Sequence, residues 1–120
     1  MAEFEKEPSS KDADPLFSTL LAESPELWDV VGEFVETLPA RVQAMQDALR
    51  DGSLDQVCAH AQRLKGVGGS YGYEAISRRA AEIEKAAHDG VIDDLSAKIA
   101  DIHAMLSRIR QGLEKHGRQG

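Results

Sequence analysis

The 120-residue chain has few cysteines, few aromatic residues and a shortage of positive charge. One cysteine, Cys58, excludes an internal disulfide framework and fits a reducing cytoplasm. Lysine and arginine number 14 against 21 acidic residues, so the formal net charge is −7. This balance argues against a nucleic-acid partner and against docking on an anionic membrane. No apolar run reaches the roughly 18 residues that a membrane-spanning helix needs.

The sequence also lacks the residue spacings of a metal site or a hydrolase. Its four histidines (His60, His88, His103 and His116) do not have metal-ligand spacing, and no strained turn presents a serine for Ser-His-Asp catalysis. We therefore expect neither a metal nor a cofactor. Sustained strand-type alternation is missing as well, which argues against a sheet.

Helical periodicity accounts for nearly all of the chain after a polar, charged leader at residues 1–14. Asp14 and Pro15 predict the cap and first turn of a short helix that ends near residue 22. Four longer helices follow, with a kink expected at Pro39. Their predicted limits are residues 25–51, 54–68, 73–87 and 93 to beyond 113.

The apolar positions of these four segments recur at three-four spacing, and tight Gly-containing turns separate them. The pattern predicts an all-α protein: an antiparallel up-down four-helix bundle at residues 15–116, with a short extra N-terminal helix and a tail at 117–120. Trp28 is expected in the core or in a partner groove near the short first helix.

The most informative stretch is 61–73, AQRLKGVGGSYGY. Each glycine inside a helix is unfavourable by roughly 1 kcal/mol relative to alanine, so something must require small residues here. The stretch resembles the Ala-His-x-Leu-Lys-Gly signature of histidine-containing phosphotransfer (HPt) domains, the carrier modules of bacterial phosphorelays. The resemblance extends over residues 15–113.

This resemblance implies a four-helix bundle that relays phosphoryl groups between receiver-domain aspartates. It implies a carrier without catalytic activity of its own. The expected partner is the receiver domain of a response regulator, with a hybrid sensor kinase as a further candidate. We expect a cytoplasmic monomer.

One departure from the family signature affects function directly. In the register set by Leu64-Lys65-Gly66, the phospho-accepting histidine of the family falls on Gln62. A glutamine amide nitrogen has its lone pair delocalised into the carbonyl, so it is not a phosphoryl acceptor. His60 is the alternative acceptor, but it lies about 200° around the helix from position 62.

The resemblance implies roles for other residues of the motif. Lys65 would contact phosphoryl oxygens or partner acids, with Arg63 adding positive potential, although a solvated basic helix face would look the same. The small residues Gly66 and Gly69 would let a partner approach the helix backbone closely. Ser70 follows them directly in the sequence. The members of this predicted partner surface are Gln62, Arg63, Lys65, Gly66, Gly69 and Ser70.

Glu84, on the next predicted helix, matches the residue that orients the acceptor ring in the family. The competing interpretation is an ordinary acid on a helix surface. With glutamine at position 62, Glu84 could accept a hydrogen bond from the Gln62 side-chain NH₂ group.

Two functional hypotheses follow. In the first, the chain is a phosphorelay module whose acceptor is replaced by Gln62, either deliberately or by loss in one lineage. In the second, it is a non-catalytic module that binds receiver domains. A Gln62→His version distinguishes them, because only a relay module would then gain phosphate.

Overall fold

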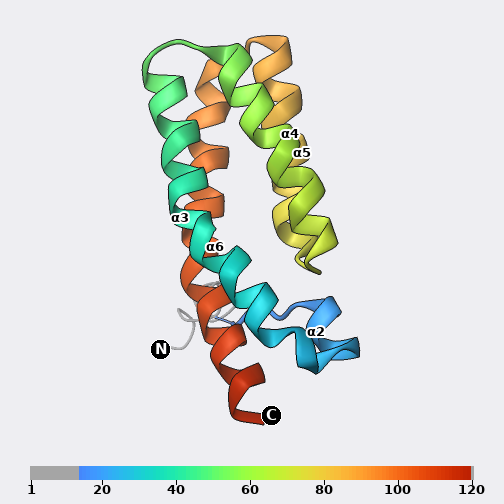
Figure 1. The fold of residues 1–120 in the computed structure, drawn as a ribbon. Helices are drawn as coiled ribbons and strands as arrows, with labels where there is room; N and C mark the ends of the chain where they lie inside the picture. Colours follow the sequence, from blue (N-terminus) through green and yellow to red (C-terminus); the bar gives the residue numbers. More distant parts are fainter. Residues whose placement is uncertain (1–13, 120) are drawn as a thin grey trace, which may run out of the picture.

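The computed structural model describes residues 14–119, and within them the chain is helical without strands (Figure 1). The elements are α2 (Thr19–Glu23), the 3₁₀ turn η2 (Pro25–Leu27), α3 (Trp28–Arg50), α4 (Leu54–Ser70), α5 (Glu74–Asp89) and α6 (Ile92–Gln119). The all-α prediction is confirmed. Nearly all of the predicted leader, residues 1–13, lies outside the described residues, as does Gly120 of the predicted tail.

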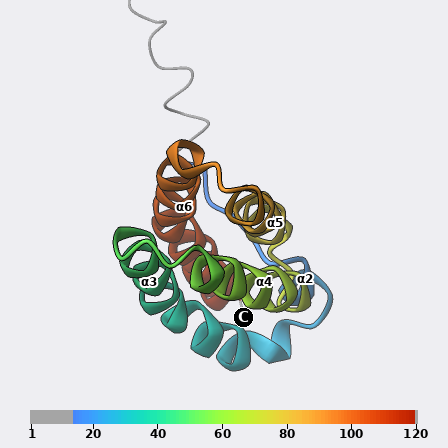
Figure 2. The ribbon, with the colours of Figure 1, turned by 90° about the horizontal axis from the view of Figure 1, so that it is seen from above.

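The four long helices run up and down beside one another, as the sequence predicted. Neighbouring pairs are α3 with α4, α4 with α5, α5 with α6, and α6 with α3 (Figure 2). The turns between successive helices contain Gly52, Gly72 and Gly90, each with a positive φ. None of the helices within residues 14–119 combines the length and the apolar character needed to span a bilayer.

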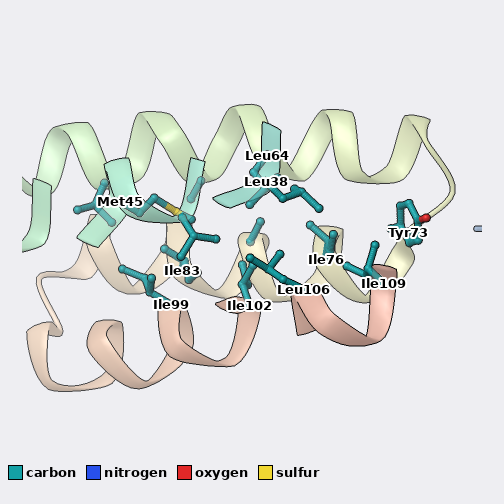
Figure 3. Packing of buried hydrophobic residues seen from close by; sticks show 14 of the residues in the cluster. Leu38, Met45, Leu64, Tyr73, Ile76, Ile83, Ile99, Ile102, Leu106 and Ile109 are labelled. Carbon is teal, nitrogen blue, oxygen red and sulfur yellow. The ribbon is translucent and has the colours of Figure 1, made fainter. Parts of the chain in front are cut away.

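Each long helix buries one apolar stripe in a shared core (Figure 3). The stripes predicted for the last three helices are buried, and their largest fully buried members are Leu64, Ile76, Ile83, Leu95, Ile99, Ile102 and Ile109. The apolar spacing of residues 25–51 also predicts Val30 in the core, and this prediction is wrong, because Val30 is 46% exposed. Val31 and Phe34 are the residues that turn inward there.

The first predicted helix begins later than expected. Residues 14–18 are not helical, and the prediction that Asp14 caps a helix starting at Pro15 is wrong. The Leu16 N–H instead donates to the Arg108 carbonyl of α6 over 2.9 Å. The Leu16 carbonyl passes so close to Gly112 that a Cβ there would lie 1.9 Å from it. This crossing over α6 overrides the local start signal.

Ser18 is the residue that caps α2. Its Oγ accepts from the Leu21 N–H at 3.1 Å and donates to the Tyr71 carbonyl at 2.7 Å. The Thr19 N–H donates to the Gly72 carbonyl at 3.0 Å. The N-terminal segment is therefore anchored twice, on α6 and on the turn between α4 and α5. Figure 1 shows α2 beside the end of the bundle where α3 and α6 extend beyond the other two helices.

Pro39 lies inside α3 without ending it. The helix is continuous from Trp28 to Arg50, although proline has no N–H to donate to the carbonyl four residues earlier. The sequence predicted a kink at this point, and the chain stays helical through it. Burial of Leu38 and Val42 on either side holds the helix in place.

Tyr73 is the one buried aromatic residue whose ionisation affects stability. Its side chain is 3% exposed, and its hydroxyl has no hydrogen-bond partner among the described residues. Burial raises the pKa of Tyr73 from 10.0 to about 12. Since the folded pKa lies above the unfolded one, the free energy of unfolding falls as the pH rises from 10 to 12, by up to about 3 kcal/mol.

Replacing Tyr73 with phenylalanine should remove this pH dependence. The Tyr73→Phe variant is expected to be as stable as the parent at pH 7, or about 1 kcal/mol more stable, because an unpaired buried hydroxyl is lost. Urea unfolding at several pH values between 7 and 12 measures both effects. A parent and variant that lose stability in parallel above pH 10 would show that Tyr73 is not the group responsible.

Candidate functional site

The motif residues of α4 divide between the core and an open face. Ala61, Leu64 and Gly68 are buried against the other helices. Gln62 and Arg63 are exposed, and the Gln62 side chain forms no hydrogen bond with another described residue. The position that the family signature assigns to the acceptor therefore lies open to a partner.

Lys65 and Glu84 form an ion pair between α4 and α5. Lys65 Nζ lies 2.7 Å from Glu84 Oε1, and the two side chains are 42% and 24% exposed. Glu84 binds Lys65 and not the Gln62 side chain, from which it could have accepted a hydrogen bond. A partly exposed pair of this kind adds at most about 1 kcal/mol to stability. Its main effect is to hold the Lys65 ammonium group beside α5.

Two further contacts fix this flank of α4 against α5. Ser77 Oγ donates to the Lys65 carbonyl at 2.9 Å, and Cys58 Sγ lies 3.8 Å from the Glu84 carbonyl. Because Cys58 and Lys65 face α5, helix geometry places His60 on the opposite flank of α4, toward α3. His60 is partly buried there and does not share a face with Lys65 and Gln62.

The glycines of α4 serve different purposes. A Cβ on Gly68 would lie 3.0 Å from Ile76 Cγ2 and 3.3 Å from the Ser77 backbone nitrogen, so Gly68 allows α4 and α5 to pack closely. A Cβ on Gly69 would make an ordinary contact with Ser77 Oγ at 3.7 Å. A Cβ on Gly66 would meet nothing within 4 Å. Packing within the chain thus explains Gly68 but not Gly66.

The remaining motif residues have local structural contacts. Ser70 Oγ donates to the Gly66 carbonyl at 3.1 Å, so this exposed hydroxyl is folded back on its own helix. The Tyr71 ring stacks on Phe34 of α3, with ring centroids 4.5 Å apart. Tyr71 and Tyr73 are therefore packing residues.

Alanine substitutions at Gly66 and Gly68 are expected to have opposite effects. Gly66→Ala should stabilise the fold by about 0.5–1 kcal/mol, because alanine favours a helix and the added methyl group has open space. Gly68→Ala should destabilise it by about 1–3 kcal/mol through overpacking against α5. Urea unfolding of both variants measures the difference. Equal effects of the two substitutions would contradict this division of roles.

Comparison with family models identifies the domain. The model of the Hpt domain matches residues 29–112, which is more than half of the chain. The chain belongs to the Hpt domain family. The match runs from the first turn of α3 to the last third of α6 and includes the motif of α4. Comparisons with curated proteins and with solved structures gave no match.

Membership in the Hpt family connects the bundle to a class of function. Hpt domains carry phosphoryl groups in two-component phosphorelays, and they interact with the receiver domains of response regulators. They are phosphotransfer carriers rather than catalysts. Within residues 14–119, the side chains do not form a cluster of three or more potential metal ligands.

Sequence reasoning missed the ion pair and the serine that support this face. Ser77 and Glu84 are seven residues apart, which places them on one stripe of α5 two turns from each other. Lys65 lies on the matching stripe of α4. That spacing indicates only that Ser77 and Glu84 share one stripe of α5, and the residue of α4 that they meet depends on how the two helices pack.

Proposed function

We propose that this Hpt domain binds a receiver domain through the open face of α4 and does not accept a phosphoryl group at position 62. The face comprises Gln62, Arg63, Lys65, Gly66, Gly69 and Ser70, and Glu84 supports it by pairing with Lys65. In this proposal the partner is a response-regulator receiver domain, alone or within a hybrid sensor kinase. The domain acts as a cytoplasmic monomer.

The observation that carries the proposal is the open space around Gly66. Glycine in the interior of a helix is unfavourable by about 1 kcal/mol relative to alanine, and no contact within the described residues requires it at this position. Gly66 lies four residues after Gln62 and therefore on the same face of α4. A partner that approaches the backbone closely at this point is a direct reason for its presence.

The chemistry at position 62 separates binding from transfer. Accepting a phosphoryl group requires a lone pair on nitrogen directed along the line of the breaking bond. The Gln62 amide does not supply one, whereas its oxygen and NH₂ group can still accept and donate hydrogen bonds at an interface. The chain with glutamine at position 62 would bind a receiver domain without accepting its phosphoryl group.

A pure binding module is the second candidate, whereas the intact motif around position 62 favours a relay module whose acceptor has been replaced. Leu64, Lys65 and Gly66 match the family signature, so a histidine at position 62 would stand in a complete motif. In this case Gln62 replaces the acceptor, and the docking surface is the same. The two candidates differ only in what a histidine at position 62 does, and both require receiver binding at α4.

Binding at α4 can be tested by adding bulk at Gly66. The affinity for receiver domains encoded in the same genome is measured by isothermal titration calorimetry. We expect Gly66→Leu to weaken binding by about tenfold or more, equivalent to ~1.4 kcal/mol. The matched control is Ala97→Leu, which adds a side chain at an exposed position of α6. Unchanged affinity of Gly66→Leu, or equal losses in both variants, would refute docking at this face.

A further inference from the structure

A second surface of the bundle forms a groove between the first turns of α3 and the last turns of α6. Its volume is about 540 Å³. Trp28, Gly32 and Leu113 are among the residues that line it, and charged side chains of both helices surround them. All residues that line the groove belong to α3 or α6, whereas Gln62 lies on α4, so the groove is separate from the face proposed to bind a receiver.

The floor of the groove is apolar and its main side chain is held in place. Trp28 Nε1 donates to the Leu113 carbonyl at 2.8 Å, which fixes the indole ring across the two helices. Trp28 nevertheless remains 38% exposed. A Cβ on Gly32 would lie 3.8 Å from Leu113 Cδ2, so the backbone of α3 lies close to α6 beneath the groove. An exposed, immobilised tryptophan is typical of the anchor positions of protein interfaces.

The rim of the groove is strongly acidic. It contains the carboxylates of Asp29, Glu33, Glu36 and Glu114 against one guanidinium group, that of Arg110. The acids of α3 follow one another at spacings of four and three, so they repel each other along the same face. None of the four forms an ion pair with a residue of the described chain.

We propose that this groove binds a basic peptide segment of a partner protein, with an apolar side chain placed against Trp28 and lysine or arginine side chains between the rim acids. Charge complementarity selects this occupant, since cations would relieve the repulsion among the carboxylates. The chain's own leader does not fit: residues 1–14 contain five acidic residues and two lysines. The helical stretch 28–36 is about 12 Å long, which suits roughly four residues of extended peptide.

Trp28 is the only tryptophan of the chain, so its fluorescence reports directly on the groove. The full chain is titrated with the synthetic peptide acetyl-Lys-Leu-Arg-Leu-Lys-amide. Two comparison peptides replace either the cations with glutamate or the leucines with glycine. We expect a saturable change in Trp28 emission with the first peptide alone, weakened by added salt because the rim charges are exposed.

Charge reversal locates the binding site. The double variant Glu33→Lys, Glu36→Lys should bind the basic peptide at least about tenfold more weakly. The matched control is Glu23→Lys, Asp51→Lys, which makes the same charge change at exposed positions outside the groove and should leave the affinity unchanged. Circular dichroism confirms that each variant is folded.

Three outcomes would overturn the proposal: no change in Trp28 emission at millimolar basic peptide, equal binding of the glutamate peptide, or equal weakening in the control variant. Receiver binding at α4 is independent of these results. A negative result with the basic peptide would not affect the proposed function. A negative result in the docking test at Gly66 would not affect the proposal for the groove.

Discussion

Replacing Gln62 with histidine is expected to convert a chain that does not label into one that takes phosphate from a phosphorylated receiver domain. The side chain at position 62 is exposed, and Leu64, Lys65 and Gly66 keep the motif intact around it. In the proposed register, only the nucleophile is missing. We expect labelling to rise from background to near one phosphoryl group per chain when the phosphorylated receiver is in excess.

The expected reaction is an in-line transfer between two proteins. The lone pair of the introduced imidazole attacks phosphorus, an N–P bond forms, and the P–O bond to the receiver aspartate breaks. The aspartate leaves as a carboxylate. Such a transfer depends mainly on positioning and on neutralising the phosphoryl oxygens. Lys65, which is paired with Glu84 one turn from position 62, is the cation that we expect to neutralise them.

Labelling is measured with radioactive phosphate, and acid lability identifies a phosphorus–nitrogen bond. Gln62→Asn, which retains an amide, is the matched control and should stay unlabelled. Labelling of the unaltered chain that is abolished by His60→Ala would show that His60 is the acceptor and that the register is wrong. A Gln62→His variant that binds receivers but does not label would support the binding module over the relay.

The Gly72→Ala variant is expected to be the most destabilised of the single glycine substitutions in the turns, losing about 3 kcal/mol or more. Gly72 has a φ of +85°, a conformation that is unfavourable for alanine by about 1–2 kcal/mol. In addition, its new Cβ would lie 2.4 Å from the Leu20 nitrogen and 2.7 Å from Ser18 Oγ. The N-terminal segment would have to leave its anchor on the turn between α4 and α5.

Gly90→Ala separates the two contributions. Gly90 has a φ of +75°, close to that of Gly72, but a Cβ there would meet nothing within 4 Å. The free energy of unfolding of Gly90→Ala should therefore fall by only about 1–2 kcal/mol, the cost of placing alanine at a positive φ. Chemical denaturation gives both values, and hydrogen exchange should show lost protection around Ser18–Leu21 in Gly72→Ala alone. Equal destabilisation of the two variants would mean that the contact with the N-terminal segment contributes nothing.

The bundle could be predicted because its signals are local. The stripe containing Leu64 and the stripe containing Ile83 each follow helical spacing, and burial of these stripes stabilises the helices far more than residue propensity does. The turns at Gly52 and Gly90 were also predictable, since glycine is the residue that adopts a positive φ without strain.

The N-terminal segment was not predictable in the same way. Asp14 and Pro15 are a reasonable helix start, yet the Leu16 backbone hydrogen bonds to Arg108, which is 92 residues away in the sequence. Gly112 permits that crossing because it has no side chain. A glycine within a long helix does not reveal from sequence alone which distant backbone passes over it.

The candidate site shows the same division between local and distant information. The motif placed Gln62, Lys65 and Gly66 on one helix face, because residues three and four apart are neighbours on a helix. It did not predict that Glu84 would pair with Lys65, since that contact depends on the rotation of α5 relative to α4. Nor did it show that Gly68 is required by close packing on Ile76, whereas no contact within the described residues requires glycine at position 66.

The measurement that tests the central claim most directly is an NMR titration of the unaltered, ¹⁵N-labelled chain with its receiver domain. The account predicts that the largest amide shifts fall at Gln62, Lys65, Gly66 and Gly69, and that no phosphohistidine forms when the receiver is phosphorylated. Shifts confined to other faces of the bundle, or phosphate transferred to the unaltered chain, would contradict it.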